Sequence, residues 1–263
     1  MSTPLITVAM PVFNAGKFLK PALLSIINQT YSNWELIIID DGCTDGCFND
    51  LPELNDPRIK LIRDGENKGI ARRLNEAINL AGGEFLARMD SDDISHPQRF
   101  ELQLNQLLSQ PKLDLLATKV LTIDKNNEVI GALPFKQNHL EICAKPWLGF
   151  YMAHPSWMGK LSWFKKHFYA DPAPYLCEDQ ELLLRTYTVS MFSTLNQELL
   201  MYRINNNPAI RKLLITRFAF FKVQIKYFLD NNNYIFLIFA FSSFVLRIVK
   251  DCMQILVSSY KNC

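Results

Sequence analysis

The feature that most restricts the fold of this chain is an alternation, over residues 1–125, between short apolar segments and longer amphipathic ones. Apolar segments without a polar face indicate strands that are buried on both sides, and their alternation with helices is typical of parallel sheets. The expected strands are 5–10, 35–39, 58–62, 84–89 and 113–123, and the expected helices are 18–28, 70–81 and 97–109. The sequence therefore predicts an α/β fold with a mostly parallel sheet flanked by helices.

Polar residues follow three of these expected strands. Asn14 comes after the first strand, Asp40 and Asp41 after the second, and the run 90–93 after the fourth. Asp and Asn are common in turns, and this explains any one of these groups. Because the carboxyl ends of parallel strands share one edge, where such sheets bind ligands, three groups together indicate a binding site.

The run 90–93 holds three carboxylates, those of Asp90, Asp92 and Asp93. Carboxylates held this close raise one another's pKa unless a cation neutralises them. Mg²⁺ and Mn²⁺ prefer oxygen ligands, and Mg²⁺ often combines one or two protein carboxylates with substrate phosphates. A D-x-D triplet is frequent by chance, so the spacing alone is weak evidence. It predicts a divalent metal and a substrate that contains a diphosphate.

Composition sets wide limits on the class of protein. With 263 residues, 49% of them hydrophobic, the chain can bury a large core. The net charge of +2 argues neither for nor against nucleic acid, and we expect no such partner. The cysteines are scattered without zinc-like spacing, and the N-terminus lacks the pattern of a signal peptide. We therefore expect reduced thiols and a cytoplasmic protein.

Beyond residue 125 the pattern is looser. A helix is expected to begin in "PAPYLCEDQELLLRTY", with Glu178, Asp179 and Glu181 in its first turn, where the helix dipole favours acids. From residue 210 the chain has helical spacing again, with Arg211 and several lysines on one arc, and it is interrupted at 231–233.

The residues after this interruption form an intensely apolar stretch, "YIFLIFAFSSFVLRIV". It is shorter than the about 20 residues that cross a bilayer. A basic, aromatic-rich amphipathic helix suits a membrane surface, so we expect the tail 210–263 to associate with a membrane. The alternative is a pair of helices packed on the preceding domain.

In their order and spacing, several motifs of the chain resemble those of the inverting glycosyltransferases of family 2, which have the GT-A fold. The resemblance covers residues 5–205 and rests on three segments: "ITVAMPVFNAGKFLKPALLSIINQTYSNWELIIIDDGCTDG", "NKGIARRLNEAINLAGGEFLARMDSDD" and "CEDQELLLR". It implies a GT-A domain over 1–209, with a nucleotide-binding half, 1–125, and an acceptor-binding half, 126–209. Two departures are Cys43, where the family usually has Ser, and Leu74, where it often has Arg.

The resemblance also implies roles for residues at the first two strand ends. Pro11, Val12 and Asn14, together with Asp40 and Asp41, would hold the nucleotide base, with Asp41 the favoured partner of a uracil N–H. Lys68, Arg72 or Arg88 would meet phosphate oxygens, and the sequence does not single one out.

For the later motifs, Asp90 and Asp92 would hold the metal and ribose, with Asp92 the foremost metal ligand. Asp93 would be a ligand or a support behind them. Asp179 would be the general base and Glu178 would orient the acceptor. His154, beside a proline, would line the acceptor pocket, bond the diphosphate or be structural.

The implied reaction transfers a hexose or N-acetylhexosamine from a UDP-sugar, with Mn²⁺ or Mg²⁺, to a sugar acceptor with inversion. The basic tail points to a lipid-diphosphate-linked acceptor at the inner face of a bacterial membrane, as in O-antigen assembly. A sugar-nucleotide pyrophosphorylase is an alternative, but the loop after its first strand is glycine-rich, whereas this one has Gly16 alone. An inactive membrane adaptor on the same fold is a third possibility, which the presence of Asp92 and Asp179 disfavours.

Overall fold

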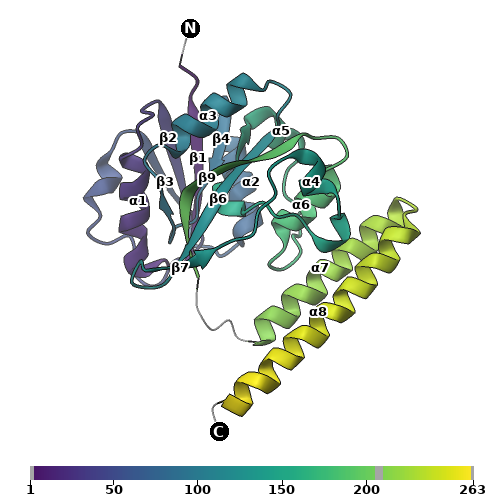
Figure 1. The fold of residues 1–263 in the computed structure, drawn as a ribbon. Helices are drawn as coiled ribbons and strands as arrows, with labels where there is room; N and C mark the ends of the chain where they lie inside the picture. The colour runs from purple at the N-terminus through teal and green to yellow at the C-terminus, as the bar shows by residue number, and fades with distance from the viewer. Residues whose placement is uncertain (1–2, 205–209, 262–263) are drawn as a thin grey trace.

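A nine-stranded sheet runs through the molecule in a computed structural model that describes residues 3–204 and 210–261 (Figure 1). Its spatial order is β3-β2-β1-β4-β8-β6-β9-β5, with β7 paired to β6. The strands are β1 (Ile6–Val12), β2 (Trp34–Asp40), β3 (Ile59–Arg63), β4 (Phe85–Arg88), β5 (Ile94–Ser95), β6 (Leu115–Ile123), β7 (Val129–Ala132), β8 (Met158–Lys160) and β9 (Phe192–Arg203).

The first four strands in the spatial order are parallel, as the sequence predicts. β1 pairs with β2 on one side and with β4 on the other, and β2 pairs with β3. In this register Val12 lies opposite Asp40, and Arg88 lies opposite Ala9. The polar residues that follow β1, β2 and β4 therefore meet at one edge of the sheet.

The other half of the sheet is mixed. β8 inserts between β4 and β6 and is antiparallel to both, while β9 runs parallel to β6 and antiparallel to β5. The predicted α/β class with flanking helices is confirmed, but the insertion of β8 was not foreseen. β8 has three residues, too few for a hydrophobic period to be recognised in the sequence.

Helices cover both faces of the sheet because successive side chains of each central strand point to opposite sides. Leu36 and Ile38 of β2 join the core under α1 and α3, while Ile37 and Ile39 join the core under α2, α5 and α6. These helices are α1 (Leu19–Ile27), α2 (Ile70–Leu80), α3 (Arg99–Ser109), α5 (Leu161–Lys166) and α6 (Glu178–Thr186). The shorter ones are α4 (His139–Cys143) and the 3₁₀ turns η1 (Gly16–Phe18), η2 (Pro52–Asn55), η3 (Pro146–Leu148) and η4 (His154–Ser156).

Two long helices, α7 (Ile210–Asp230) and α8 (Tyr234–Lys261), form an antiparallel hairpin along one side of the domain (Figure 1). The predicted break at 231–233 is confirmed by the turn between them. The hairpin packs on η3, where the Trp147 ring lies 4.9 Å from the rings of Phe236 and Phe239. Gln224 and Arg247 donate hydrogen bonds to main-chain carbonyls of the same turn.

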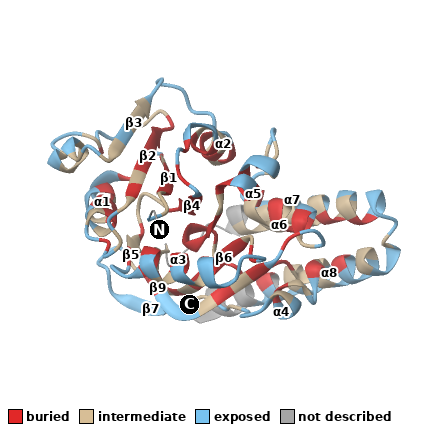
Figure 2. Cartoon of the chain, turned by 90° about the horizontal axis from the view of Figure 1, so that it is seen from above, coloured by how far each residue is buried: buried red, intermediate tan, exposed pale blue. Residues whose placement is uncertain are grey.

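The hairpin also carries many exposed apolar side chains, and pale blue and tan alternate along both of its helices in Figure 2. The most exposed of these are Phe218, Tyr234, Ile235, Ile238, Phe241, Leu246 and Met253. Within the described residues, no helix is long and apolar enough to cross a bilayer. The side chains of Arg211 and Lys212, which the sequence places on the basic arc, lie outside the described ones.

Candidate active site

A cavity of about 630 Å³ opens at the carboxyl edge of the parallel strands. Its size suits a nucleotide-sized ligand. The walls come from the end of β1, the residue after β2, the start of α2 and the turn before it, the residues after β4, the loop 171–176 and the first residue of α6. Segments far apart in the sequence thus enclose one space, which we call the donor cavity.

Some of the residues that the sequence singled out line the donor cavity, and others lie outside its wall. Those that line it are Pro11, Val12, Asp41, Lys68, Arg72, Asp90 and Glu178. Those that are not among the lining residues are Asn14, Asp40, Asp92, Asp93, His154 and Asp179. The loop 171–176 is a wall that the sequence did not reveal, because it has no periodic pattern.

Asp41 joins the end of β2 to the start of α2. Its carboxylate accepts hydrogen bonds from the backbone N–H groups of Lys68, at 2.7 Å, and Gly69, at 3.1 Å. It also accepts one from Nε of Arg73 at 2.8 Å. The Arg73 side chain is fully buried and also pairs with Asp64 and Glu76. Sequence reasoning missed Arg73, whose role depends on acids from three different elements.

Asn14 and Asp40 hold the loops at the edge of the sheet. The Asn14 side-chain oxygen accepts from the Thr44 N–H at 2.8 Å, which ties the loop after β1 to the loop after β2. Asp40 accepts from the Cys43 N–H and from Nε of Arg63, both at 2.8 Å. The contacts of both residues are therefore with the chain itself, and they support the cavity from outside its wall.

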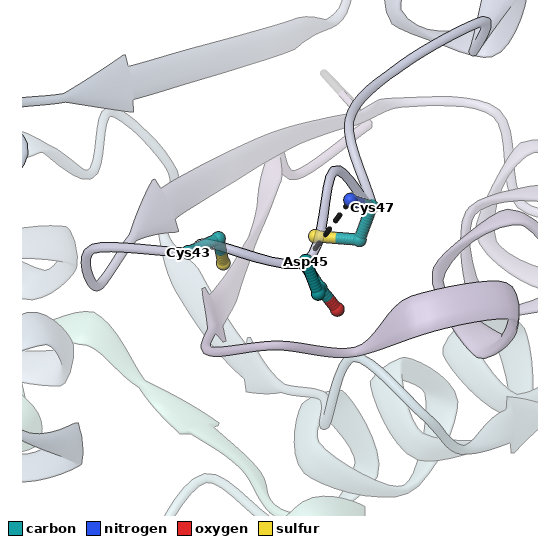
Figure 3. A group of neighbouring side chains, drawn as sticks. All are labelled: Cys43, Asp45 and Cys47. Atoms are coloured by element: carbon teal, nitrogen blue, oxygen red, sulfur yellow. Dashed lines mark hydrogen bonds between the residues drawn. The ribbon is translucent and has the colours of Figure 1, made fainter.

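Cys43, Asp45 and Cys47 come together in the loop after β2, with their sulfur and carboxylate atoms within 4.8 Å of one another (Figure 3). Burial raises the pKa of both thiols, so they are protonated at neutral pH, whereas metals bind the thiolate. The Asp45 carboxylate accepts from the Gly16 and Cys47 N–H groups. These contacts indicate that the cluster holds the loop after β2 in place against the loop after β1.

The three carboxylates after β4 differ in environment. Asp90 lines the cavity and pairs with Nη2 of Arg88 at 2.5 Å. Burial, and then the charge of Asp90, raise the pKa of the half-buried Asp92 to about 6. Asp93 is fully buried, and one of its oxygens accepts the Arg203 N–H at 2.8 Å. Asp93 therefore also anchors the end of β9.

The second Asp93 oxygen is buried, and it has no hydrogen-bond partner in the described part of the chain. Burial and the charges of Asp90 and Asp92 raise the Asp93 pKa well above its usual value. The negative charges of the three carboxylates are therefore not fully neutralised by the cations around them. An all-oxygen donor set of this kind fits a hard divalent cation such as Mg²⁺ or Mn²⁺.

Glu178 and Asp179 begin α6 on the other side of the cavity. Burial, and then Asp179, raise the pKa of Glu178 to about 7, and burial raises that of Asp179. Asp179 accepts from Nε2 of Gln180 at 3.2 Å, and Oε1 of Gln180 accepts the Phe150 N–H at 2.8 Å. Glu178 therefore faces the donor cavity, while Asp179 is linked to the segment that contains Phe150.

His154 lies behind Glu178. Its Nε2 is 2.7 Å from the Tyr169 hydroxyl, and its Nδ1 is 3.7 Å from Oε1 of Glu178. Burial lowers the His154 pKa well below its usual value, so the ring is neutral at neutral pH. His154 therefore supports the acidic pair from behind.

Lys68 and Arg72 line the cavity, as expected of phosphate contacts, but both already have acidic partners. Lys68 Nζ is 2.6 Å from an Asp64 oxygen, and Arg72 Nε is 2.7 Å from an Asp171 oxygen. The second pair joins α2 to the loop 171–176. A phosphate that bound either cation would have to compete with these carboxylates.

Comparisons with protein families, with curated proteins and with solved structures all point to the same family. The model of "Glycosyl transferase family 2" matches residues 7–168. The chain is 34% identical over 131 residues to the Escherichia coli UDP-Glc:alpha-D-GlcNAc-diphosphoundecaprenol beta-1,3-glucosyltransferase WfgD, covering 50% of this chain and 51% of that one. It is 29% identical over 274 residues to an uncharacterized glycosyltransferase of Methanocaldococcus jannaschii, covering 95% and 94%.

Among solved structures, S. aureus TarS in complex with UDP-GlcNAc is similar, with a TM-score of 0.69 and 18% sequence identity. The match covers 87% of this chain and 66% of that one. It shows that the GT-A fold is shared. Several of the curated relatives are matched over about half of their length, from 41% to 51%.

Proposed function

The chain belongs to glycosyl transferase family 2, and from this premise we propose that it transfers a hexose or N-acetylhexosamine from a UDP-sugar to a sugar hydroxyl. The observation that carries the proposal is the donor cavity, in which Asp90 from the sheet edge and Glu178 from α6 line the same space. Two acidic groups from different elements in one space suit the two ends of a transfer reaction, the leaving diphosphate and the attacking hydroxyl.

The nucleotide enters, in this proposal, between the loop after β1 and the turn into α2. Pro11, Val12 and Asp41 lie around the base, and Lys68 and Arg72 reach the phosphates by leaving their acidic partners. The complexes of TarS with UDP and UDP-GlcNAc support a UDP-sugar as the donor.

Asp90 and Asp92 would hold Mn²⁺ or Mg²⁺, with Asp93 behind them. When bound, such an ion supplies positive charge for the diphosphate that departs. Asp93 fixes the end of β9 through the Arg203 N–H, which keeps the other two carboxylates in place.

Asp179 takes the proton of the acceptor hydroxyl. Its link through Gln180 to the segment that contains Phe150, outside the lining of the donor cavity, supports an acceptor that approaches from that segment, opposite the leaving diphosphate. Glu178, which precedes Asp179 and lines the donor cavity, orients the acceptor. A single displacement inverts the anomeric centre, so an α-linked donor yields a β-glycoside.

The acceptor is a sugar linked through a diphosphate to a membrane lipid, and the protein lies on the inner face of a bacterial membrane in surface polysaccharide assembly such as that of O-antigen. Two observations support this. WfgD, by its name, acts on a diphosphoundecaprenol-linked sugar. The hairpin of α7 and α8 carries exposed apolar side chains together with Lys222 and Lys226, a composition that suits a membrane surface.

The direct experiment is a panel of UDP-sugars, each incubated with a synthetic lipid-diphosphate sugar and Mn²⁺, with UDP release as the readout. We expect one donor to release UDP only when acceptor and metal are both present. If no donor in the panel releases UDP and UDP itself does not bind, the proposal is wrong. A parallel assay for diphosphate release from UTP and a sugar 1-phosphate tests the pyrophosphorylase alternative.

A further inference from the structure

Arg88, the last residue of β4, is a buried cation beside the donor cavity, and its side chain is 3% exposed. Its main chain is fixed, because its N–H donates to the Trp157 carbonyl and its carbonyl accepts from Arg99. Its guanidinium reaches Asp90, with Nη2 2.5 Å from Oδ1. Asp90 lines the cavity, and Arg88 is behind it.

Two nitrogen atoms of this guanidinium have no partner among the residues that the structure describes. They are Nε and Nη1, and both are buried. Buried donors of this kind are rare in folded proteins, and a charged donor is more costly to leave unpaired than a neutral one. Such an arrangement indicates a second partner in another state of the site.

The acidic pair at the start of α6 offers that partner. Glu178 is buried, and the neutral ring of His154 lies 3.7 Å from one of its oxygens. In the described part of the chain, no side chain of another residue donates a hydrogen bond to it. The positive charge of Arg88 acts on both Glu178 and Asp179 and opposes the rise that burial gives to their pKa values. The buried donors of Arg88 lie next to Asp90, and Glu178 lines the same cavity as Asp90.

We propose that Arg88 is a resident cation that changes partner: it pairs with Asp90 in the free protein and donates to Glu178 once Asp90 holds a divalent metal. This inference rests on the proposed function and extends it to the order of events. Arg88 is a positioning residue, since it acts on the reacting groups through Asp90 and Glu178.

The reason for the exchange is electrostatic. A guanidinium and a divalent cation on the same carboxylate repel each other, so metal binding weakens the bond between Arg88 and Asp90. Arg88 is anchored by its main chain and buried, so it needs another anion nearby. Pairing with Glu178 would fix the first turn of α6, and with it Asp179.

The test is Mn²⁺ binding to the purified full-length protein, measured by calorimetry without any sugar. Arg88→Met removes the competing cation, so we expect Mn²⁺ to bind about fivefold more tightly or better. At the same time kcat for transfer should fall by about tenfold or more, because Glu178 loses its partner. An arginine with only a structural role would give weaker Mn²⁺ binding and weaker activity together.

Arg99→Met is the matched control. Arg99 is an equally buried arginine, but its N–H groups bind Gln103, Met89 and the main-chain carbonyls of residues 88 and 157, so its loss should not tighten Mn²⁺ binding. Thermal unfolding of each variant checks that it is folded.

If Arg88→Met does not fold, Glu178→Gln replaces it in the test. In this variant Arg88 has no second partner and stays paired with Asp90, so Mn²⁺ binding should weaken. The control is Asp179→Asn, which removes the neighbouring negative charge, and it should weaken Mn²⁺ binding less. Weaker Mn²⁺ binding in folded Arg88→Met, or equal effects of Glu178→Gln and Asp179→Asn, would overturn the exchange. Failure of the proposed function would be recognised by a different result: the wild-type protein would neither bind UDP nor release it from any donor.

Discussion

Each carboxylate of the site has a different source of positive charge. Asp41 has Arg73 and two backbone N–H groups, and Asp90 has Arg88. Asp92 and Asp93 have weaker compensation, and their pKa values are raised. The four carboxylates are therefore compensated by positive charge to different extents.

The raised pKa of Asp92 predicts a pH-dependent stability. Its pKa is about 6 in the folded protein, whereas the ordinary value, which applies to the unfolded chain, is 3.8. Between these two pH values the folded state therefore binds more protons than the unfolded state. The metal-free protein therefore loses stability as the pH rises through this window. Asp92→Asn should raise the free energy of unfolding at pH 7.5 by about 1–3 kcal/mol, as measured by urea denaturation with EDTA. No gain at pH 7.5 would contradict the burial of an uncompensated charge.

The same residue should control metal-dependent donor binding. Asp92→Ala is expected to abolish the strengthening of UDP binding by Mn²⁺ in calorimetry, because the foremost ligand is lost. UDP binding without metal should be close to that of the wild type, which serves as the control. Unchanged Mn²⁺ dependence would show that the metal is held elsewhere.

Asp179→Asn tests the assignment of the base. Loss of a general base should lower kcat by about 10²–10⁴-fold, while UDP binds as it does to the wild type. Glu178→Gln provides the comparison, and it should keep more activity because the role proposed for Glu178 is to orient the acceptor and not to take its proton. Near wild-type turnover of Asp179→Asn with intact UDP binding would remove Asp179 from this role.

At the scale of elements, the donor cavity depends on how β2, β3 and α2 are joined. The buried Arg73 connects Asp41 after β2, Asp64 after β3 and Glu76 of α2. The neighbouring Arg72 is more than half exposed and pairs with Asp171. Of these two adjacent arginines, Arg73 therefore joins three segments inside the protein, whereas Arg72 forms a single ion pair at the surface.

This difference predicts different costs for the same substitution. Arg73→Met leaves the buried Asp41 carboxylate without its cation and should destabilise the fold by about 3–5 kcal/mol. Arg72→Met removes an exposed ion pair and should cost less than about 1 kcal/mol. Urea denaturation of both variants measures the two values. Equal losses would mean that the Arg73 network does not join these elements.

At the scale of the whole molecule, the hairpin of α7 and α8 has two different sides. One side packs on η3 through Trp147, Phe236 and Phe239. Other side chains, including Ile235 and Ile238, are about two-thirds exposed. Deletion of the hairpin would uncover the packed side, so point substitutions of exposed residues are the better test of membrane association.

The triple variant Ile235→Ser, Ile238→Ser and Leu246→Ser should lose most of its cosedimentation with phosphatidylglycerol vesicles, because less apolar surface enters the membrane interface. Its thermal stability should stay near that of the wild type, since all three side chains are exposed. Leu140→Ser, at an exposed apolar residue of α4, is the control. Unchanged vesicle binding of the triple variant would reject the membrane role.

The sequence alone determined the class of fold, the carboxyl edge with its acidic residues and the break between the last two helices. It could do so because hydrophobic periodicity and turn preferences are local properties, read within a few residues. The polar groups after β1, β2 and β4 share an edge simply because these strands are parallel.

The tertiary structure decided which charges meet. The insertion of β8 between β4 and β6 and the pairing of Arg73 with Asp41 depend on contacts between segments that are distant in the sequence. Burial then set the pKa values, raising those of Asp92 and Glu178 and lowering that of His154. A sequence lists ionisable groups, but their charge depends on the solvent and the neighbours that the folded chain leaves them.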